Sequence, residues 1–133
     1  MRIIKWIGIG CALALLTACF FPWVTIEARS IVITGVYAQH TNWGKPGSWH
    51  FVFATLYIAF ALVNKTWSVR GNLVITALNL AWALRNFILM GNCEMGECPV
   101  KHTALYIVLF TSICMLLTTL FSGVRVPNSE TKP

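Results

Sequence analysis

The sequence predicts an all-α membrane protein: one domain over residues 1–133, built as a four-transmembrane-helix bundle with a small extracytoplasmic cap. Hydrophobic residues make up 57% of the chain and charged residues only 11%, and the mean hydropathy is +0.70. A soluble domain of this size needs more polar surface than that composition supplies. The charged residues mostly border long apolar runs, as expected because a charge in hydrocarbon costs several kcal/mol.

Four apolar runs, each of a length suited to crossing a bilayer, follow one another along the chain. A helix of about 20 apolar residues crosses about 30 Å of hydrocarbon. The polar segment that joins the second and third runs is short, so we expect those helices to be antiparallel neighbours. The predicted spans cover residues 3–26, 48–67, 73–90 and 103–124.

The segments between the spans are polar. The first outer loop, residues 27–47, contains a β-branched and aromatic stretch at residues 31–37 that is too short to span as a helix. Such a stretch favours a short strand or hairpin on the membrane surface. The second outer loop covers residues 91–102, and residues 125–133 form a polar tail.

Basic residues predict the orientation, because Lys and Arg concentrate on the cytoplasmic side of a membrane protein. One side of the four-span arrangement carries six of them: Arg2, Lys5, Lys65, Arg70, Arg125 and Lys132. The other side carries three: Arg29, Lys45 and Lys101. We therefore expect a multi-pass protein of a bacterial-type inner membrane, with both termini cytoplasmic.

An alternative interpretation concerns the N-terminus. The residues Leu16-Thr17-Ala18-Cys19 follow a basic start and read like a bacterial lipobox, which would make Cys19 a lipidation site. The apolar run continues through Ile26, however, whereas a lipoprotein normally continues as a polar tether. This continuation favours a membrane span.

The five cysteines divide into two groups. Cys93 and Cys98 lie in the second outer loop, where an oxidising environment favours disulfides, and we expect a structural disulfide between them. A catalytic dithiol usually has two intervening residues, so a thiol oxidoreductase is the less favoured interpretation. Cys11, Cys19 and Cys114 lie within spans, where they are most simply small packing residues.

The histidines suggest a metal site. His40, His50 and His102 all fall on the predicted outer side, together with acidic and methionine side chains. Imidazole suits copper and zinc, so these three residues are the candidate ligands of a copper or zinc ion. Their spacing matches no helical or turn motif, and the alternative is that they anchor helix ends.

The third span carries the polar residues that are the most costly to place in a membrane. Arg85 needs acceptors for its guanidinium group, and we expect either an internal ion pair with Glu27 or an anion on a lipid or partner. Asn72, Asn79 and Asn86 recur every seven residues and so share one helix face. This face is expected to contact other helices, in the chain or in a partner. The candidate partner- or ligand-binding residues are Asn79, Trp82, Arg85 and Asn86.

No nucleotide-binding, hydrolase or redox-cofactor signature stands in the sequence, and its basic residues are too dispersed for nucleic acid. The sequence therefore favours a non-enzymatic role as an accessory or scaffolding subunit of a larger inner-membrane complex. Its partners would be the lipid bilayer and other integral membrane subunits, or a second copy of the chain. The alternatives are a metal-handling or thiol-redox membrane protein and, third, a small transporter or channel component.

Overall fold

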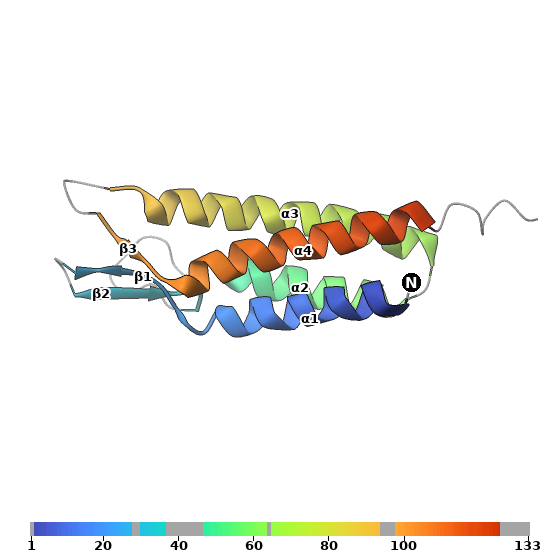
Figure 1. Ribbon diagram of the computed structural model, residues 1–133, viewed down its shortest axis with the longest axis horizontal. Coiled ribbons are helices and arrows are strands. Elements are labelled where there is room, and N and C mark those ends of the chain that lie inside the picture. The colour runs from blue at the N-terminus through green and yellow to red at the C-terminus, as the bar shows by residue number, and fades with distance from the viewer. Residues whose placement is uncertain (1, 28–29, 37–46, 64, 94–97, 126–133) are drawn as a thin grey trace, which may run out of the picture.

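The computed structural model describes residues 2–27, 30–36, 47–63, 65–93 and 98–125. The described residues form four helices. These helices run alternately up and down side by side, and short strands gather at one end of the bundle (Figure 1). We call this the sheet end; the opposite, terminal end holds the start of the first helix and the end of the last. The elements are α1 (Arg2–Ala18), β1 (Pro22–Ile26), β2 (Ile31–Thr34), α2 (Ser48–Leu62), α3 (Thr66–Gly91), β3 (Val100–Lys101) and α4 (Thr103–Arg125).

The first predicted span is divided between a helix and a strand. Helix α1 ends at Ala18, and the predicted helical residues 22–26 instead form β1. Pro22 lacks the N–H that a helix would use, and the residues after it are aromatic or β-branched, which favours a strand. The span prediction was therefore too long at this end.

The three strands form one sheet in the order β2-β1-β3. Strand β1 pairs antiparallel with β2, in a register that includes Val24 with Ile33. It pairs antiparallel with β3 on its other edge, where Val24 faces Lys101. The hairpin predicted for the first outer loop thus exists, but its first strand comes from the predicted span. The second outer loop adds the third strand, which the sequence did not predict.

The short polar segment predicted between the second and third spans is mostly helical. Helix α2 ends at Leu62 and α3 begins at Thr66, well before the predicted start at residue 73. The hydroxyl of Ser68 lies 2.6 Å from the carbonyl oxygen of Val63 and 2.7 Å from that of Lys65. These contacts hold Val63 and Lys65 against the first turn of α3.

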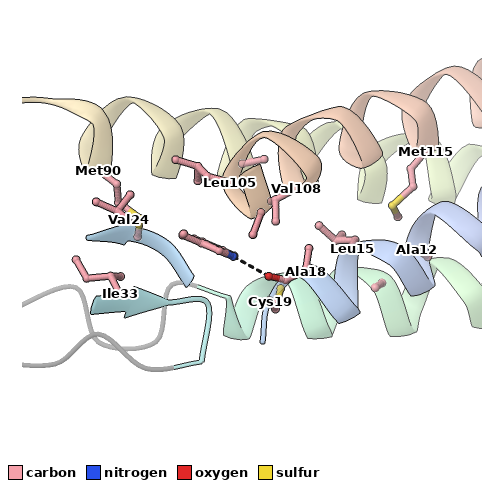
Figure 2. Packing of buried hydrophobic residues seen from close by; sticks show 14 of the residues in the cluster. Ala12, Leu15, Ala18, Cys19, Val24, Ile33, Met90, Leu105, Val108 and Met115 are labelled. Carbon is pink, nitrogen blue, oxygen red and sulfur yellow. Dashed lines mark hydrogen bonds between the residues drawn. The ribbon is translucent and has the colours of Figure 1, made fainter. Parts of the chain in front are cut away.

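The apolar core continues from the sheet into the bundle. Val24 and Ile33 of the sheet lie beside Leu105 and Met90, and the packing extends along α1 and α4 toward Met115 (Figure 2). Trp23 is the largest fully buried side chain, and its indole N–H donates to the carbonyl of Ala18 at 2.9 Å. The sheet is therefore packed on the helices as part of one core.

A close backbone approach fixes the start of α2. The N–H of Gly47 donates to the carbonyl oxygen of Gly35 at 2.5 Å. A Cβ atom on Gly47 would lie 2.6 Å from that same oxygen, which is closer than real Cβ atoms come. Glycine is thus required here, and the contact seats the first turn of α2, with His50 in it, beneath the sheet.

Two of the helices, Thr66–Gly91 and Thr103–Ser122, are long and apolar enough to cross a membrane. Two shorter apolar helices, Ile3–Ala18 and Ser48–Leu62, complete the bundle. Helical structure with membrane-type composition is thus present as expected, and so is a small sheet.

Candidate functional site

Polar side chains occupy the middle of the bundle. On α3 the buried positions follow a seven-residue repeat that includes Asn72, Asn79 and Asn86, as the sequence pattern predicted. Each of these residues faces the other helices of the same chain. Helices α2 and α4 contribute further buried polar residues: His50, Thr111, Ser112 and Thr119.

Three of these side chains form a hydrogen-bonded network that joins α2, α3 and α4. The Nδ1 atom of His50 lies 2.7 Å from Oδ1 of Asn79. The Nδ2 group of Asn79 donates to the hydroxyl of Ser112 at 3.0 Å. Ser112 in turn donates to the carbonyl oxygen of Val108 at 2.7 Å. His50, Asn79 and Ser112 are each fully buried, so the network lies in the core.

The direction of these bonds fixes the tautomer of His50. The Ser112 hydroxyl donates its hydrogen bond to the carbonyl oxygen of Val108, so it accepts the hydrogen bond from the amide nitrogen of Asn79. Oδ1 of Asn79 has no proton and must therefore accept a hydrogen bond from His50. The imidazole proton is then on Nδ1, and Nε2 carries a lone pair. Neither Nε2 of His50 nor Oδ1 of Asn72 has a hydrogen-bond partner among the described residues. The interior thus presents two buried acceptors.

Hydroxyl groups on the helices are satisfied by their own backbone. Thr17 and Thr55 are exposed, yet each donates to the carbonyl four residues earlier, at 2.9 Å and 2.7 Å. The buried hydroxyls of Thr76, Thr111 and Thr119 do the same. This pattern suits helices in an apolar solvent, which offers a hydroxyl no other partner.

The residues predicted to bind a partner or ligand lie on two different faces of α3. Asn79 and Asn86 are buried, whereas Trp82 is half-buried and Arg85 is exposed. The guanidinium carbon of Arg85 lies 4.7 Å from the centre of the Trp82 ring. Trp82 lies 6.1 Å from Trp49, and Trp49 stacks on Phe53 at 6.0 Å. We call these four side chains, from α2 and α3, the aromatic–arginine row.

The ion pair expected between Arg85 and Glu27 is absent. Glu27 is exposed at the end of β1, and in the described part of the chain no salt bridge joins it to Arg85. The expectation assumed that a helix continued to Glu27. The chain instead turns into a strand at Pro22, which moves the carboxylate off the helical surface.

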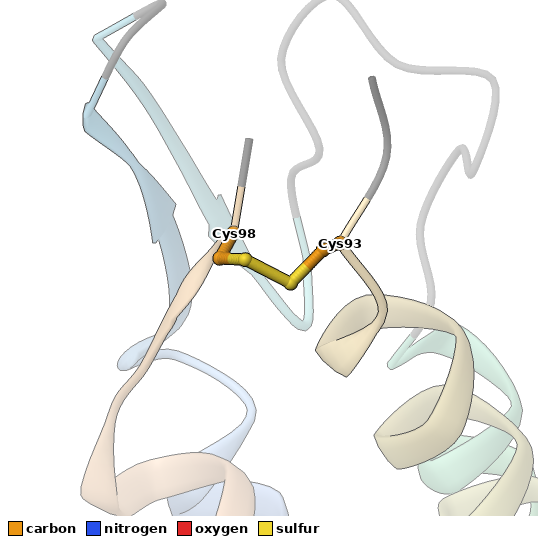
Figure 3. Close-up of a disulfide and its surroundings, with 2 residues drawn as sticks. All are labelled: Cys93 and Cys98. Atoms are coloured by element: carbon orange, nitrogen blue, oxygen red, sulfur yellow. A yellow bond between two sulfur atoms is a disulfide. The ribbon is translucent and has the colours of Figure 1, made fainter. Parts of the chain in front are cut away.

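The predicted disulfide between Cys93 and Cys98 is present, with a Cα–Cα distance of 4.2 Å. It joins the segment that leaves α3 to the segment that leads into β3 and α4 (Figure 3). The bond closes a short loop at the sheet end, outside the helical part of the bundle. Both cysteines are exposed.

Replacing Cys93 and Cys98 together with serine is expected to lower the free energy of unfolding by about 2 kcal/mol, because the closed loop is short and its closure entropy small. Equilibrium unfolding in mild detergent, with and without a reductant, measures this. Reduction should lower the stability of the unmodified chain and leave the doubly substituted chain unchanged. An equal effect of the reductant on both proteins would contradict the assignment.

The three histidines predicted to bind copper or zinc have separate roles where they are described. His50 belongs to the buried network, and Nε2 of His102 hydrogen-bonds the Thr25 hydroxyl at 2.5 Å, across the β1–β3 edge. His40 lies outside the described residues. Within the described ranges, no three His, Cys, Asp or Glu side chains come together as a metal site. The metal site stays a prediction that depends on His40.

An open groove of about 580 Å³ lies between the sheet-end halves of α1 and α4, and His102 is its basic side chain. Its walls are mainly apolar, and the other lining residues are Ala14, Thr17, Ala18, Phe21, Pro22, Thr103, Ala104 and Ile107.

The three free cysteines differ in burial. Cys19 is fully buried in the core, as expected of a packing residue, whereas Cys11 and Cys114 are only half-buried.

Sequence reasoning missed two groupings. It did not join His50 and Ser112 to Asn79, because the partners are about 30 residues apart and on three different helices. It also missed that Trp49 of α2 meets Trp82 of α3, with 6.1 Å between the ring centres. No local spacing signals either grouping. Only the seven-residue repeat of asparagines pointed to one member of the first.

Comparison with known proteins yields no match to any family model, to any curated protein or to any solved structure.

Proposed function

We propose that the chain is a four-span membrane protein that serves as a non-enzymatic accessory or scaffolding subunit of a larger inner-membrane complex. The observation that carries the proposal is the apolar outer surface of the helices. Large apolar side chains are exposed on all four helices, including Trp6, Val52, Val74 and Phe110, while several asparagine, serine, threonine and histidine side chains are buried among the apolar residues of the core. A water-soluble bundle would present mainly polar side chains on its outer surface.

The lengths of the shorter helices are compatible with four spans. Helix α1 has 17 residues and α2 has 15, which correspond to about 25 Å and 22 Å at 1.5 Å per residue. Both continue into apolar flanking residues such as Phe20, Phe21 and Val63, which are exposed. A modest local thinning of the bilayer accommodates the remaining difference.

The aromatic–arginine row is the surface that we propose contacts a partner subunit. Tryptophan and arginine are enriched at the energetic centres of protein interfaces. The ring contacts already hold the row in place, so little side-chain freedom remains to be lost on binding. The cation–π contact contributes about 0.5 to 2 kcal/mol, less than the several kcal/mol that a charge facing lipid costs. A carboxylate on the partner would supply the remainder.

Purification in mild detergent tests this role. We expect larger membrane subunits to co-purify in constant ratio with the chain. Arg85→Gln keeps the length of the side chain but removes its charge, and it should reduce that ratio at least tenfold. Arg70→Gln, on the exposed surface near the terminal end of the same helix, is the matched control. Retention of every partner by the Arg85→Gln protein would assign Arg85 to lipid phosphate instead and contradict the proposed surface.

The proposed topology makes a separate prediction. Reporter fusions at residue 1, at Lys65 and at residue 133 should all report the cytoplasm, because basic residues concentrate at the terminal end. A fusion at residue 40 should report the opposite side. Termini that report different sides would rule out four spans, whatever the partner experiment shows.

A further inference from the structure

The groove between α1 and α4 has the size of a site for one small amphipathic molecule. Its volume is about 580 Å³, and ligand sites measure about 300 to 1,000 Å³. Its α1 wall runs from Ala14 to Phe21, which corresponds to about 10 Å at 1.5 Å per residue. A transmembrane helix of a partner would run along about 30 Å of hydrocarbon. The groove is therefore long enough for part of an extended hydrocarbon chain and too short to seat a helix.

The polar groups of the groove gather at its sheet end. Nε2 of His102 forms a hydrogen bond with the Thr25 hydroxyl at 2.5 Å, which ties the imidazole to β1 and leaves Nδ1 for a ligand. When the Thr25 hydroxyl donates this bond, or when the ring is protonated, Nδ1 carries a proton and is a donor. His102 is half-buried, so the ring borders the groove from a fixed position.

The first turn of α4 adds donors beside the imidazole. Helix α4 begins at Thr103, and both Thr103 and Ala104 line the groove. The first N–H groups of a helix have no earlier carbonyl oxygen to bond, and they carry the positive end of the helix dipole. Together with His102 they make one end of an otherwise apolar groove complementary to an anionic oxygen, as phosphate groups require.

We propose that this groove binds one phospholipid. An acyl chain fills the apolar part between Ala14 and Ile107, and the lipid phosphate accepts hydrogen bonds from His102 and from the first turn of α4. The match depends on position as well as chemistry. The proposed topology places the sheet end at the outer surface of the membrane, which is where lipid phosphates lie. The inference therefore rests on the proposed membrane insertion, but it requires no partner subunit.

Native mass spectrometry of the full-length chain in mild detergent tests the proposal. The protein is titrated with phosphatidylglycerol and, separately, with diacylglycerol that has the same two chains but no phosphate. We expect one phosphatidylglycerol for each chain, bound about tenfold or more tightly than diacylglycerol, because only the phosphate reaches the donors at the sheet end. Equal binding of the two lipids would overturn the role of the phosphate.

Substitutions in the wall locate the lipid. Ala14 is exposed on α1, so Ala14→Phe should fill the groove without disturbing the core and weaken phosphatidylglycerol binding about tenfold. Gly10→Phe is the matched control, because Gly10 lies one turn away on the same helix and a Cβ atom there meets nothing within 4 Å. It should bind as the unmodified chain does. Unchanged binding by Ala14→Phe would place the lipid elsewhere and overturn the proposal.

A second pair of variants tests the imidazole. His102→Phe keeps a ring but removes both nitrogens, so it should weaken phosphatidylglycerol binding about tenfold and leave diacylglycerol binding unchanged. Thr25→Val removes the same bond to β1 but keeps the imidazole, and it should retain most of the binding. Equal losses in both variants would show that His102 acts only through the sheet and would overturn its contact with phosphate.

The same spectra report the alternative occupant. A dimer of the chain that forms as lipid is removed, and that Ala14→Phe disrupts, would assign the groove to a second copy and overturn the lipid site. Failure of the lipid site leaves the reporter-fusion topology and the co-purification of larger subunits unaffected, so it is distinguishable from failure of the proposed function.

Discussion

Replacing Trp23 with alanine is expected to lower the free energy of unfolding by about 3 to 5 kcal/mol, the usual cost of truncating a fully buried tryptophan. The Trp23 side chain is completely buried between the sheet and the helices. It packs edge-on against His50 at 6.0 Å and donates a hydrogen bond to Ala18. Its loss would leave a cavity at the junction that seats the sheet on the bundle. Equilibrium unfolding in detergent micelles measures the change.

Two further substitutions show how much of this loss of stability comes from the hydrogen bond and how much from the buried apolar area of Trp23. Trp23→Phe keeps most of the apolar area but removes the donor to the Ala18 carbonyl, so it should cost less than alanine, about 1 to 2 kcal/mol. Trp6→Ala, on the exposed surface of α1, should change stability by less than about 1 kcal/mol. Equal losses for Trp23→Ala and Trp6→Ala would mean that Trp23 does not anchor the sheet.

The second large effect is expected at Asn79, the centre of the buried network. Asn79→Leu removes two interhelical hydrogen bonds and leaves the Nδ1–H group of His50 without an acceptor. Interhelical hydrogen bonds in membrane proteins contribute about 0.6 kcal/mol on average and about 1.7 at most. With the orphaned imidazole added, the expected loss is about 2 to 3 kcal/mol. Unfolding in detergent micelles measures this loss as well.

A double-mutant cycle tests whether the network acts as a unit. His50→Phe combined with Asn79→Leu should cost clearly less than the sum of the two single substitutions, because the double variant leaves no unpaired imidazole. Leu78→Ala, at the adjacent exposed position on α3, is the control and should be nearly neutral. Strict additivity of the two network substitutions would show that His50 and Asn79 do not depend on each other.

The sequence predicted those parts of the site that depend on local pattern. The repeat of Asn72, Asn79 and Asn86 placed all three on one face of α3, because helical geometry alone decides which residues share a face. The disulfide between Cys93 and Cys98 was equally predictable, since five positions of chain keep two cysteines within bonding range. The sequence placed Arg85 next to Asn86 but did not show which way its side chain points. Neighbouring positions on a helix face different directions, and Arg85 is exposed whereas Asn86 is buried.

The remaining features depend on contacts between distant segments. Nothing local in the sequence assigns His50 to Asn79 rather than to a metal ion. The same is true of the aromatic–arginine row, which needs α2 and α3 side by side before Trp49 can meet Trp82. Such groupings arise when helices pack, and the order of residues along the chain does not encode them in any short window.

Hydropathy, periodicity and short distances along the chain were enough to predict the membrane-type composition, the four apolar helices, the hairpin near the first outer loop and the local disulfide. Tertiary packing set where the helices end and which polar residues face inward. It turned residues 22–26 into a strand, since pairing with β2 and β3 satisfies backbone groups that a helix interrupted by Pro22 would leave open. It also directed Asn79 inward and Arg85 outward, because His50 and Ser112 offer the amide partners inside the bundle.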